Sequence, residues 1–250
     1  MITVSTPPDW RELQNEVARV LRECGFGVEV EHTVATVRGQ VELDVFAEET
    51  VRGRKYSIAC ECKHWRANVP QSVIHGFRTV VADIGANVGY VITTNGFQTG
   101  AFSAADLTNL RLVTWPEFQQ AFEETWFEQY LSPKVVEELD DLLSFTEPLL
   151  PRWFEQLSED GKTSYLALKQ KYDDFGWLVM AFTPYARMLR KKEGPTPLPV
   201  IDRLPADSPL LASVPRAILE AVGYRDFLEL VVPFGKEAIR QFSALDPRRG

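Results

Sequence analysis

The ten residues 56–65, YSIACECKHW, restrict the fold more than any other part of the chain. Small and apolar side chains dominate this stretch, which predicts a buried β-strand. Side chains alternate between the two faces of a strand, so Ile58, Cys60 and Cys62 occupy one face, while Ala59, Glu61 and Lys63 share the other. An isolated Glu-x-Lys on a strand is most often an exposed ion pair that contributes little to stability. The apolar neighbours instead favour a functional role for these two charges.

The preceding strand supplies a third charged residue. Residues 41–47, VELDVFA, alternate apolar and polar side chains, and the segment TVRGRKY after them predicts a turn. A hairpin between the two strands brings Asp44 beside Glu61 and Lys63. Two convergent carboxylates form a hard-oxygen site suited to Mg²⁺, with the main-chain carbonyl of Cys62 as a further ligand. A cation there would polarise a phosphodiester and activate water, with the lysine assisting, so the pattern predicts phosphodiester hydrolysis.

The order of the elements predicts an α/β fold. A helix begins after Asp9 and ends near Gly25, an antiparallel run of strands follows, and later strands are linked through helices. Such an order is typical of a mixed β-sheet flanked by helices. After about residue 125 only helical patterns remain. We therefore expect two domains, residues 1–124 and a mainly α-helical C-terminal domain of residues 125–250.

Composition limits the class of protein. The 250 residues carry a net charge of −8, which argues against a general nucleic-acid binder but allows a local basic surface. No apolar run is long enough to span a bilayer, and the first residues lack a signal-peptide pattern, so we expect a cytoplasmic protein without a membrane contact. The three cysteines fit a reducing compartment, and their spacing does not suggest structural zinc.

Taken together, these motifs resemble the PD-(D/E)xK nucleases, and more narrowly the Mrr-like restriction endonucleases. The resemblance rests on VELDVFA, on YSIACECKHW and on the later strand and helix GYVITTNGFQTGA, and covers about residues 10–122. It implies a restriction-endonuclease-like fold in which Asp44 and Glu61 bind metal and Lys63 is catalytic. It also implies cleavage of double-stranded DNA with Mg²⁺ (Mn²⁺ as a substitute), a role in defence against foreign DNA, and a homodimer with two active sites.

The chain departs from the family on its first helix. The family commonly has a glutamate about 11 residues before the closing glycine, where this chain has Gln14. Either Gln14 orients water or a ligand, or Glu16 substitutes in a shifted register. Gln71, at the start of the helix after the site, is a further supporting candidate. Weaker candidates for contacts with DNA, for which a packing, turn or helix-end role is the alternative, are His64, Thr94, Arg190, Lys191 and Lys192.

Two other interpretations remain open from the sequence. The chain could be a catalytically weak or inactive nuclease fold that serves as a DNA-binding or protein-interaction module, with a protein partner bound by the helical half. Gln14 and the acidic total favour this alternative. The intact set of Asp44, Glu61 and Lys63 favours an enzyme, because a binding module has no need to hold two carboxylates together. A nuclease acting on branched DNA or RNA would use the same chemistry.

Overall fold

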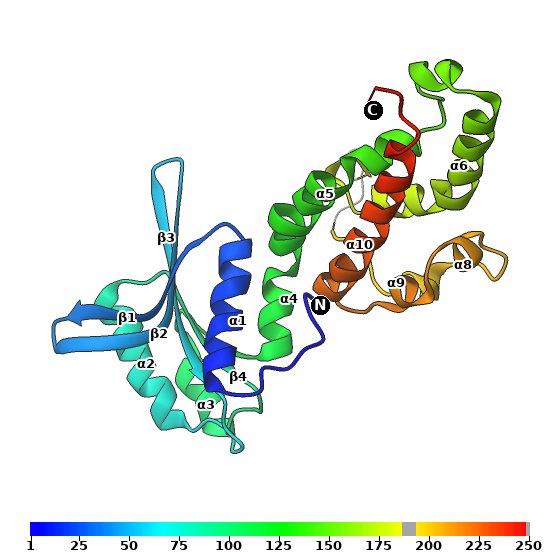
Figure 1. Cartoon of the computed structure of the whole chain (residues 1–250). Coiled ribbons are helices and arrows are strands. Elements are labelled where there is room, and N and C mark those ends of the chain that lie inside the picture. The colour runs from blue at the N-terminus through cyan, green and yellow to red at the C-terminus, as the bar shows by residue number, and fades with distance from the viewer. Residues whose placement is uncertain (187–193, 249–250) are drawn as a thin grey trace. The chain divides into compact units, whose positions relative to one another are not determined.

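The computed structural model describes residues 1–186 and 194–248, which form two compact units (Figure 1). The first unit is Ser5–Trp126, and the second combines Met1–Val4 with Phe127–Gly250. The N-terminal residues join the second unit because the N–H groups of Tyr224 and Arg225 donate to main-chain carbonyls of Met1 and Ile2. The predicted domain division after residue 124 assigned these first residues to the other part.

The first unit is built on a five-stranded mixed sheet. Its strands are β1 (Gly27–Thr36), β2 (Gly39–Val51), β3 (Arg54–Lys63), β4 (Val88–Thr93) and β5 (Leu110–Thr114), and they lie side by side in that order. Strand β2 is antiparallel to both of its neighbours, β1 and β3, and β4 and β5 continue the sheet in parallel with β3. The predicted mixed α/β fold is confirmed.

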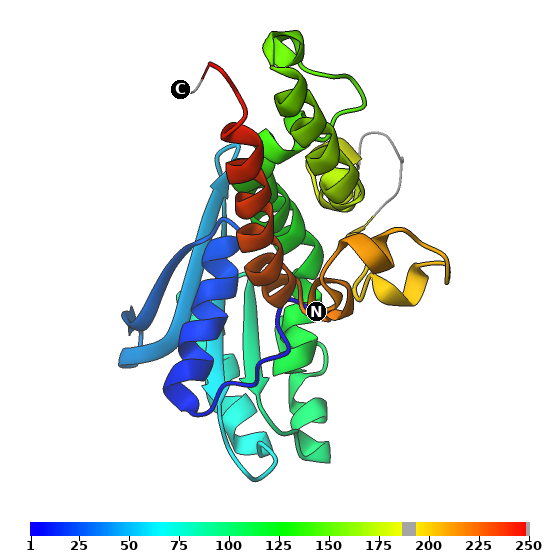
Figure 2. The same ribbon diagram turned by 45° about the vertical axis from the view of Figure 1, so that its right-hand side comes forward.

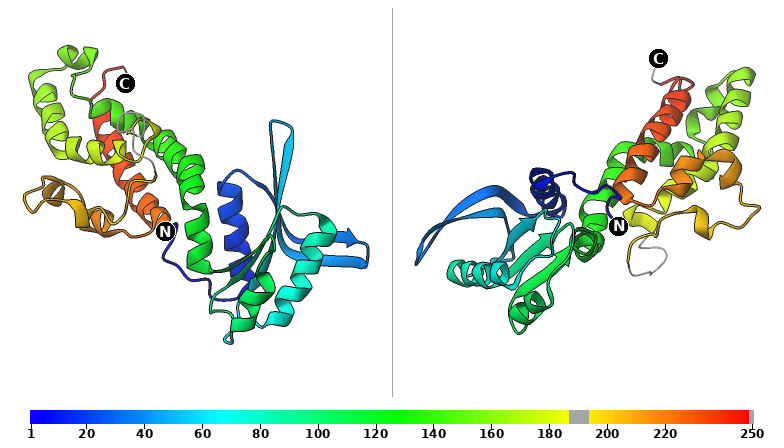
Figure 3. Two further views of the ribbon diagram at one scale, coloured as in Figure 1. Left: turned by 180° about the vertical axis from the view of Figure 1, so that it is seen from behind. Right: turned by 90° about the horizontal axis from the view of Figure 1, so that it is seen from below.

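Helices cover both faces of this sheet (Figure 3). One face carries α1 (Trp10–Glu23) and α4 (Trp115–Trp126), and the other carries α2 (Gln71–Ile84) and α3 (Thr99–Ala105). Helix α1 begins as predicted, because the Asp9 carboxylate accepts the N–H of Glu12 at 2.9 Å. It ends where Gly25 adopts a φ of +95°, a conformation that favours glycine.

The core between the sheet and α2 shows where the regular strand pattern fails. Leu43 and Phe46, three residues apart on β2, both pack in this core together with Ala59 and Phe77. Strict alternation would put them on opposite faces. Strict alternation, which would place Leu43 with Val45 on the face away from Glu61 and Lys63, therefore does not hold at this point of β2. The pleat is interrupted at Asp44, next to a gap in the pairing of β1 with β2.

The second unit contains only helices among its described residues, as predicted (Figure 2). Its elements are η1 (Phe127–Leu131), α5 (Ser132–Phe145), η2 (Arg152–Gln156), α6 (Glu159–Met180), η3 (Ile201–Arg203), α8 (Leu210–Ser213), α9 (Arg216–Glu220) and α10 (Tyr224–Ser243). Helices α5, α6 and α10 pack through aromatic side chains: Phe242 stacks on Phe145 with ring centroids 5.0 Å apart and meets Tyr165 at 5.3 Å. Among the described helices, none combines the length and apolar character of a membrane span.

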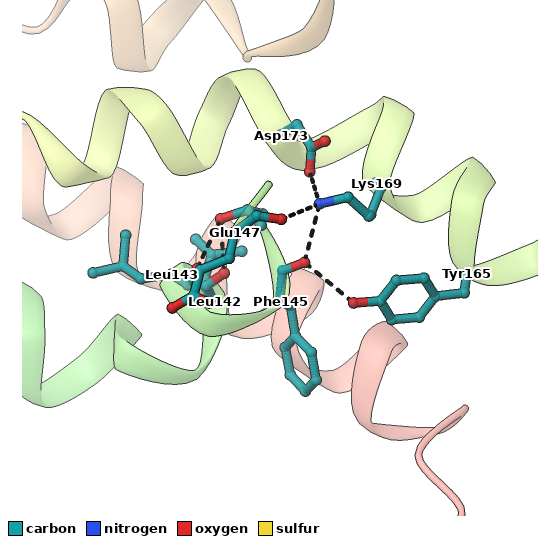
Figure 4. A network of polar contacts seen from close by, with 8 residues as sticks. Leu142, Leu143, Phe145, Glu147, Tyr165, Lys169 and Asp173 are labelled. Carbon is teal, nitrogen blue, oxygen red and sulfur yellow. Dashed lines mark hydrogen bonds and ion pairs between the residues drawn. The ribbon is translucent and has the colours of Figure 1, made fainter. Parts of the chain in front are cut away.

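A buried lysine closes the end of α5 (Figure 4). Lys169 of α6 is 9% exposed, and its Nζ donates to the carbonyl of Glu147 at 2.7 Å and to Asp173 Oδ1 at 3.0 Å. The carbonyl of Phe145 accepts from the same Nζ at 3.5 Å and from the Tyr165 hydroxyl at 3.3 Å. The last carbonyls of a helix have no partner within it, so these side chains satisfy groups that would otherwise be buried alone.

Candidate active site

Asp44 lies where the pairing of β2 with β3 stops. The regular register runs from Val51 opposite Arg54 to Val45 opposite Cys60 and goes no further. Beyond it, the N–H of Cys62 donates to Asp44 Oδ2 at 2.6 Å, so a side chain takes the place of the next main-chain acceptor. The carboxylate is thereby held against the peptide group that joins Glu61 to Cys62. This is the neighbourhood that the predicted hairpin required.

Gln14 fixes the other oxygen of the same carboxylate. Its side-chain Nε2 donates to Asp44 Oδ1 at 2.7 Å, and the residue is only 5% exposed on the buried face of α1. The side-chain nitrogen of Gln14, not its oxygen, faces Asp44, because an ionised carboxylate accepts hydrogen bonds and does not donate them. Position 14 is therefore the place where α1 reaches the candidate site.

Glu61 and Lys63 form an ion pair on the α2 side of the sheet. Lys63 Nζ lies 2.5 Å from Glu61 Oε1, and their side chains are 17% and 23% exposed. Burial raises the pKa of Glu61 above its usual range, and the charge of Asp44 raises it further. Lys63 acts in the opposite direction and lowers that pKa. The ion pair thus holds a carboxylate in a setting that otherwise disfavours its charge.

A hollow of about 380 Å³ opens beside this pair. Its walls come from β2, β3 and α2, and they include Leu43, Val73 and Phe77 together with the Glu61 and Lys63 side chains. Trp65 also lines the hollow, remains 43% exposed, and lies with its ring centroid 5.5 Å from Lys63 Nζ. Its position two residues after Lys63 is the signal in the sequence that Trp65 borders the site.

The donors present suit a hard cation. Asp44, Glu61 and the carbonyl of Cys62 offer oxygen ligands, and Mg²⁺ typically takes one or two carboxylates and completes its shell with water. Within residues 1–186 and 194–248, no three His, Cys, Asp or Glu side chains are grouped closely enough to hold a metal ion by themselves. A two-carboxylate site completed by a carbonyl and water is the arrangement that these residues fit.

Three of the other predicted residues, Glu16, Gln71 and His64, have side-chain contacts with partners outside this group. Glu16 forms an ion pair with Arg19 on α1 at 3.5 Å, and the Gln71 amide contacts His75 Nε2 at 2.8 Å on α2. His64 Nε2 lies 3.2 Å from the carbonyl of Pro7. The N–H of Thr94 donates to the carbonyl of Lys63 at 3.3 Å, which places Thr94 next to the site through its main chain. The predicted basic contacts Arg190, Lys191 and Lys192 lie outside the described residues.

The cysteines have no part in the proposed chemistry through their sulfur atoms. Cys24, Cys60 and Cys62 are all free and buried. Burial raises the pKa of each thiol, that of Cys24 to about 12. A thiol that remains protonated is a poor nucleophile and a poor metal ligand.

Residues 8–122 match the family model Mrr_cat, described as a restriction endonuclease. The match covers 115 of the 250 residues and shows that this segment is similar to the restriction endonucleases of that family. The Mrr_cat segment includes α1, the whole sheet and the group around Asp44, and the family match supports a nuclease. The resemblance drawn from the sequence is confirmed at the level of the family.

The remaining comparisons add little to the Mrr_cat match. The chain is similar to a solved structure titled "Crystal Structure of Protein of Unknown Function AF1548", with 22% sequence identity and a TM-score of 0.39. That similarity covers 54% of this chain and 78% of the other. No curated protein matches the chain.

The second unit contains a larger hollow, of about 720 Å³, that none of the predicted site residues lines. It lies beside η1, the C-terminal part of α6 and the proline-rich segment, and its walls include Phe127, Trp177 and Phe182. The candidate site of the Mrr_cat segment is therefore the only one of the two hollows that combines paired carboxylates with a lysine.

Proposed function

We propose that this protein is a metal-dependent endonuclease that hydrolyses phosphodiester bonds in DNA, with Asp44, Glu61 and Lys63 at its active site. The contact that supports this most strongly is the hydrogen bond from the Cys62 N–H to Asp44, which holds one carboxylate against the peptide that carries the other. Neighbouring carboxylates repel each other, and the charge of Asp44 raises the pKa of Glu61. A bound cation offsets this repulsion, so two neighbouring carboxylates favour a metal site.

Asp44, Glu61 and the carbonyl of Cys62 would hold Mg²⁺, or Mn²⁺ in its place. The cation, when bound, supplies a polarised phosphate and an activated water. Gln14 keeps the Asp44 carboxylate oriented, and Lys63 presents its ammonium group to the negative charge that builds on the phosphate oxygens. Placing an ammonium beside the aromatic ring of Trp65 restricts where it points.

The test is cleavage of supercoiled plasmid by the full chain with Mg²⁺ or with EDTA. We expect nicked or linear products only with metal, and a rate lower by at least about 100-fold in Lys63→Met, because one charge-stabilising donor is commonly worth that much. Lys162→Met is the matched control: Lys162 is also paired with a glutamate, at 3.2 Å, but lies in the second unit. Equal cutting by wild type and Lys63→Met would falsify the proposed site.

The same assay separates the alternative functions. Single-stranded DNA, a four-way junction and RNA are tested beside the plasmid, because the chemistry of the site is common to all of them. Metal-dependent cutting of the junction or RNA alone would assign the nuclease to that substrate. Binding of DNA with no cutting of any substrate would assign the chain to the class of inactive, nuclease-fold binding modules.

We also propose a role in defence and a dimeric state. Support for defence comes from the restriction endonuclease description of the family, and the test is whether cells expressing the wild type, but not Lys63→Met, resist phage.

Cutting both strands of a duplex calls for two active sites, so we expect a homodimer by light scattering. Three free cysteines fit a reducing compartment such as the cytoplasm. A protein partner of the helical unit would be found as a co-purifying protein that a chain ending at Trp126 does not retain.

A further inference from the structure

Residues 49–56 form a two-stranded arm that extends beyond the rest of the sheet, and we call it the β2–β3 arm (Figure 1). Strand β1 pairs with β2 only as far as Glu48, and β4 begins to pair with β3 only at Ile58. Between these limits the two strands of the arm pair with no other strand of the described sheet. A two-stranded ribbon alone in water is only marginally stable. The arm therefore adds little to the stability of the sheet, which suggests a role in binding.

The tip of the arm carries an arginine in an unfavourable backbone conformation. Arg52 and Gly53 form the two-residue turn, with φ values of +50° and +78°, as in a type I′ turn. Asparagine or glycine is the favoured residue at the first of these positions, because a positive φ is costly for most side chains. The chain therefore places a guanidinium at the outermost point of the arm where a better turn former would fit.

Two arginines of the arm have no acidic partner. Within the described parts of the chain, neither Arg52 nor Arg54 forms an ion pair, and both are exposed. Lys55 differs, since its Nζ lies 2.5 Å from Glu48 Oε2. The arginine at the other hairpin, Arg38, also has a partner, because its Nε lies 3.5 Å from Asp83 Oδ2. In a chain with a net charge of −8, two free guanidinium groups at one tip are a local basic feature.

We propose that the β2–β3 arm binds the phosphate backbone of duplex DNA on the flank of the cleavage position, through Arg52 and Arg54. This inference rests on the proposed nuclease function. Guanidinium groups match phosphate oxygens in geometry and charge, and a two-stranded ribbon is narrow enough to enter the major groove.

Strand β3 connects the arm directly to the candidate site. Arg54 begins β3 and Glu61 lies seven residues further along it. At about 3.3 Å per residue the strand spans roughly 23 Å between them, or about seven base-pair steps of 3.4 Å. A phosphate held by the arm would thus lie on the duplex flank, well outside the bond that is cut.

The alternative use of the arm is contact with a second copy of the chain. Val51 and Tyr56 are 52% and 41% exposed, and the edges of the arm have unpaired main-chain groups. Such edges can pair with another strand. The free arginines favour DNA, because arginines facing a second identical arm would repel each other.

The experiment is DNA binding by the full chain in EDTA, where cleavage does not occur. The double variant Arg52→Asn with Arg54→Thr removes both charges while supplying residues suited to the turn and to a strand. The control is Arg111→Thr, an exposed arginine on the opposite edge strand β5 of the same sheet. Affinity for a labelled duplex is measured by fluorescence anisotropy between about 50 and 200 mM salt.

We expect the slope of log affinity against log salt to fall in magnitude by about 1.8 in the double variant, about 0.9 for each lost phosphate contact. Over that salt range the wild type then loses roughly tenfold more affinity than the variant. The Arg111→Thr slope is expected to equal that of the wild type. A duplex that extends fewer than about seven base pairs from the cut is expected to bind both proteins equally.

Three results would overturn the inference. An unchanged salt slope in the double variant, while the wild type still binds and cuts DNA, rejects the arm but leaves the nuclease proposal standing. A lower mass by light scattering in the double variant assigns the arm to contacts between copies. Absence of any DNA binding or cutting by the wild type removes both proposals together.

Discussion

Replacing Gln14 with glutamate tests whether α1 faces a metal site, without measuring catalysis. In Gln14→Glu the new carboxylate stands where an amide now donates to Asp44 Oδ1 at 2.7 Å. Gln14 is 5% exposed, so water screens the two charges poorly. Without metal, the variant loses a hydrogen bond to a charged acceptor, worth about 1.5–3 kcal/mol, and gains a repulsion.

The penalty has an upper bound, because the new carboxyl can take up a proton and donate to Asp44 instead. Holding a glutamate of ordinary pKa near 4.3 protonated at pH 7 costs about 3.7 kcal/mol, at 1.36 kcal/mol per unit. We therefore expect a loss of about 2–4 kcal/mol at pH 7, or roughly 8–16 °C in Tm for a unit of this size. Because the carboxyl pKa is raised in the folded state, the loss grows as pH rises, and at pH 5 it shrinks to about 1 kcal/mol.

Magnesium is expected to reduce the difference in stability between Gln14→Glu and the wild type. At about 100 times its dissociation constant, a bound ion stabilises the folded state by about 2.7 kcal/mol, and a third carboxylate tightens the binding. The Tm of Gln14→Glu is therefore expected to rise more with Mg²⁺ than that of the wild type. Differential scanning calorimetry in EDTA and in Mg²⁺, at pH 7 and pH 5, measures both effects.

Asn15→Asp serves as the control, since it adds the same charge at the next, exposed position of α1. Its Tm is expected to stay close to that of the wild type and to respond to Mg²⁺ equally. The reasoning is refuted if Gln14→Glu matches the wild type in EDTA, or if Mg²⁺ stabilises the two proteins by the same amount. Either result means that position 14 does not face a cation.

Four further predictions concern the pH response and the packing. Lys63 lowers the pKa of Glu61, so Lys63→Met is expected to raise it, and the pH of half-maximal Mg²⁺ binding moves upward in calorimetric titrations. Lys169→Met leaves the Glu147 carbonyl, just after α5, without its donor and removes one of the two donors to the Phe145 carbonyl, which costs about 1–3 kcal/mol in urea unfolding. Gly89→Ala puts a methyl group 2.6 Å from side chains of β5 and α2 and costs about 1–3 kcal/mol in thermal unfolding. Gly76→Ala, in open space within α2, is expected to stabilise by about 0.5–1 kcal/mol.

Local chemistry in the sequence was enough to predict much of the first unit. Asp9 before an amphipathic run and glycine after it predicted α1, because helix ends need partners for unpaired main-chain groups. Strand alternation likewise predicted that Glu61 and Lys63 share a face, and they form an ion pair there. Their catalytic role, with that of Asp44, stays a prediction.

Contacts between distant parts of the chain were decided only by the tertiary structure. Gln14 was a candidate by its position alone; its partner, Asp44, is 30 residues away and is met only when α1 packs on the sheet. The alternation rule failed at Leu43, because the break in the pleat depends on how β1 pairs with β2.

For the β2–β3 arm, too, the sequence predicted one part and the tertiary structure decided the other. The sequence contained its turn and its arginines, yet the predicted strands stopped short of it. That these residues form a ribbon without neighbours depends on where β1 and β4 begin and end. Short-range preferences set each element, since they act within a few residues, whereas the location of a charge relative to its partners depends on the packing of the whole unit.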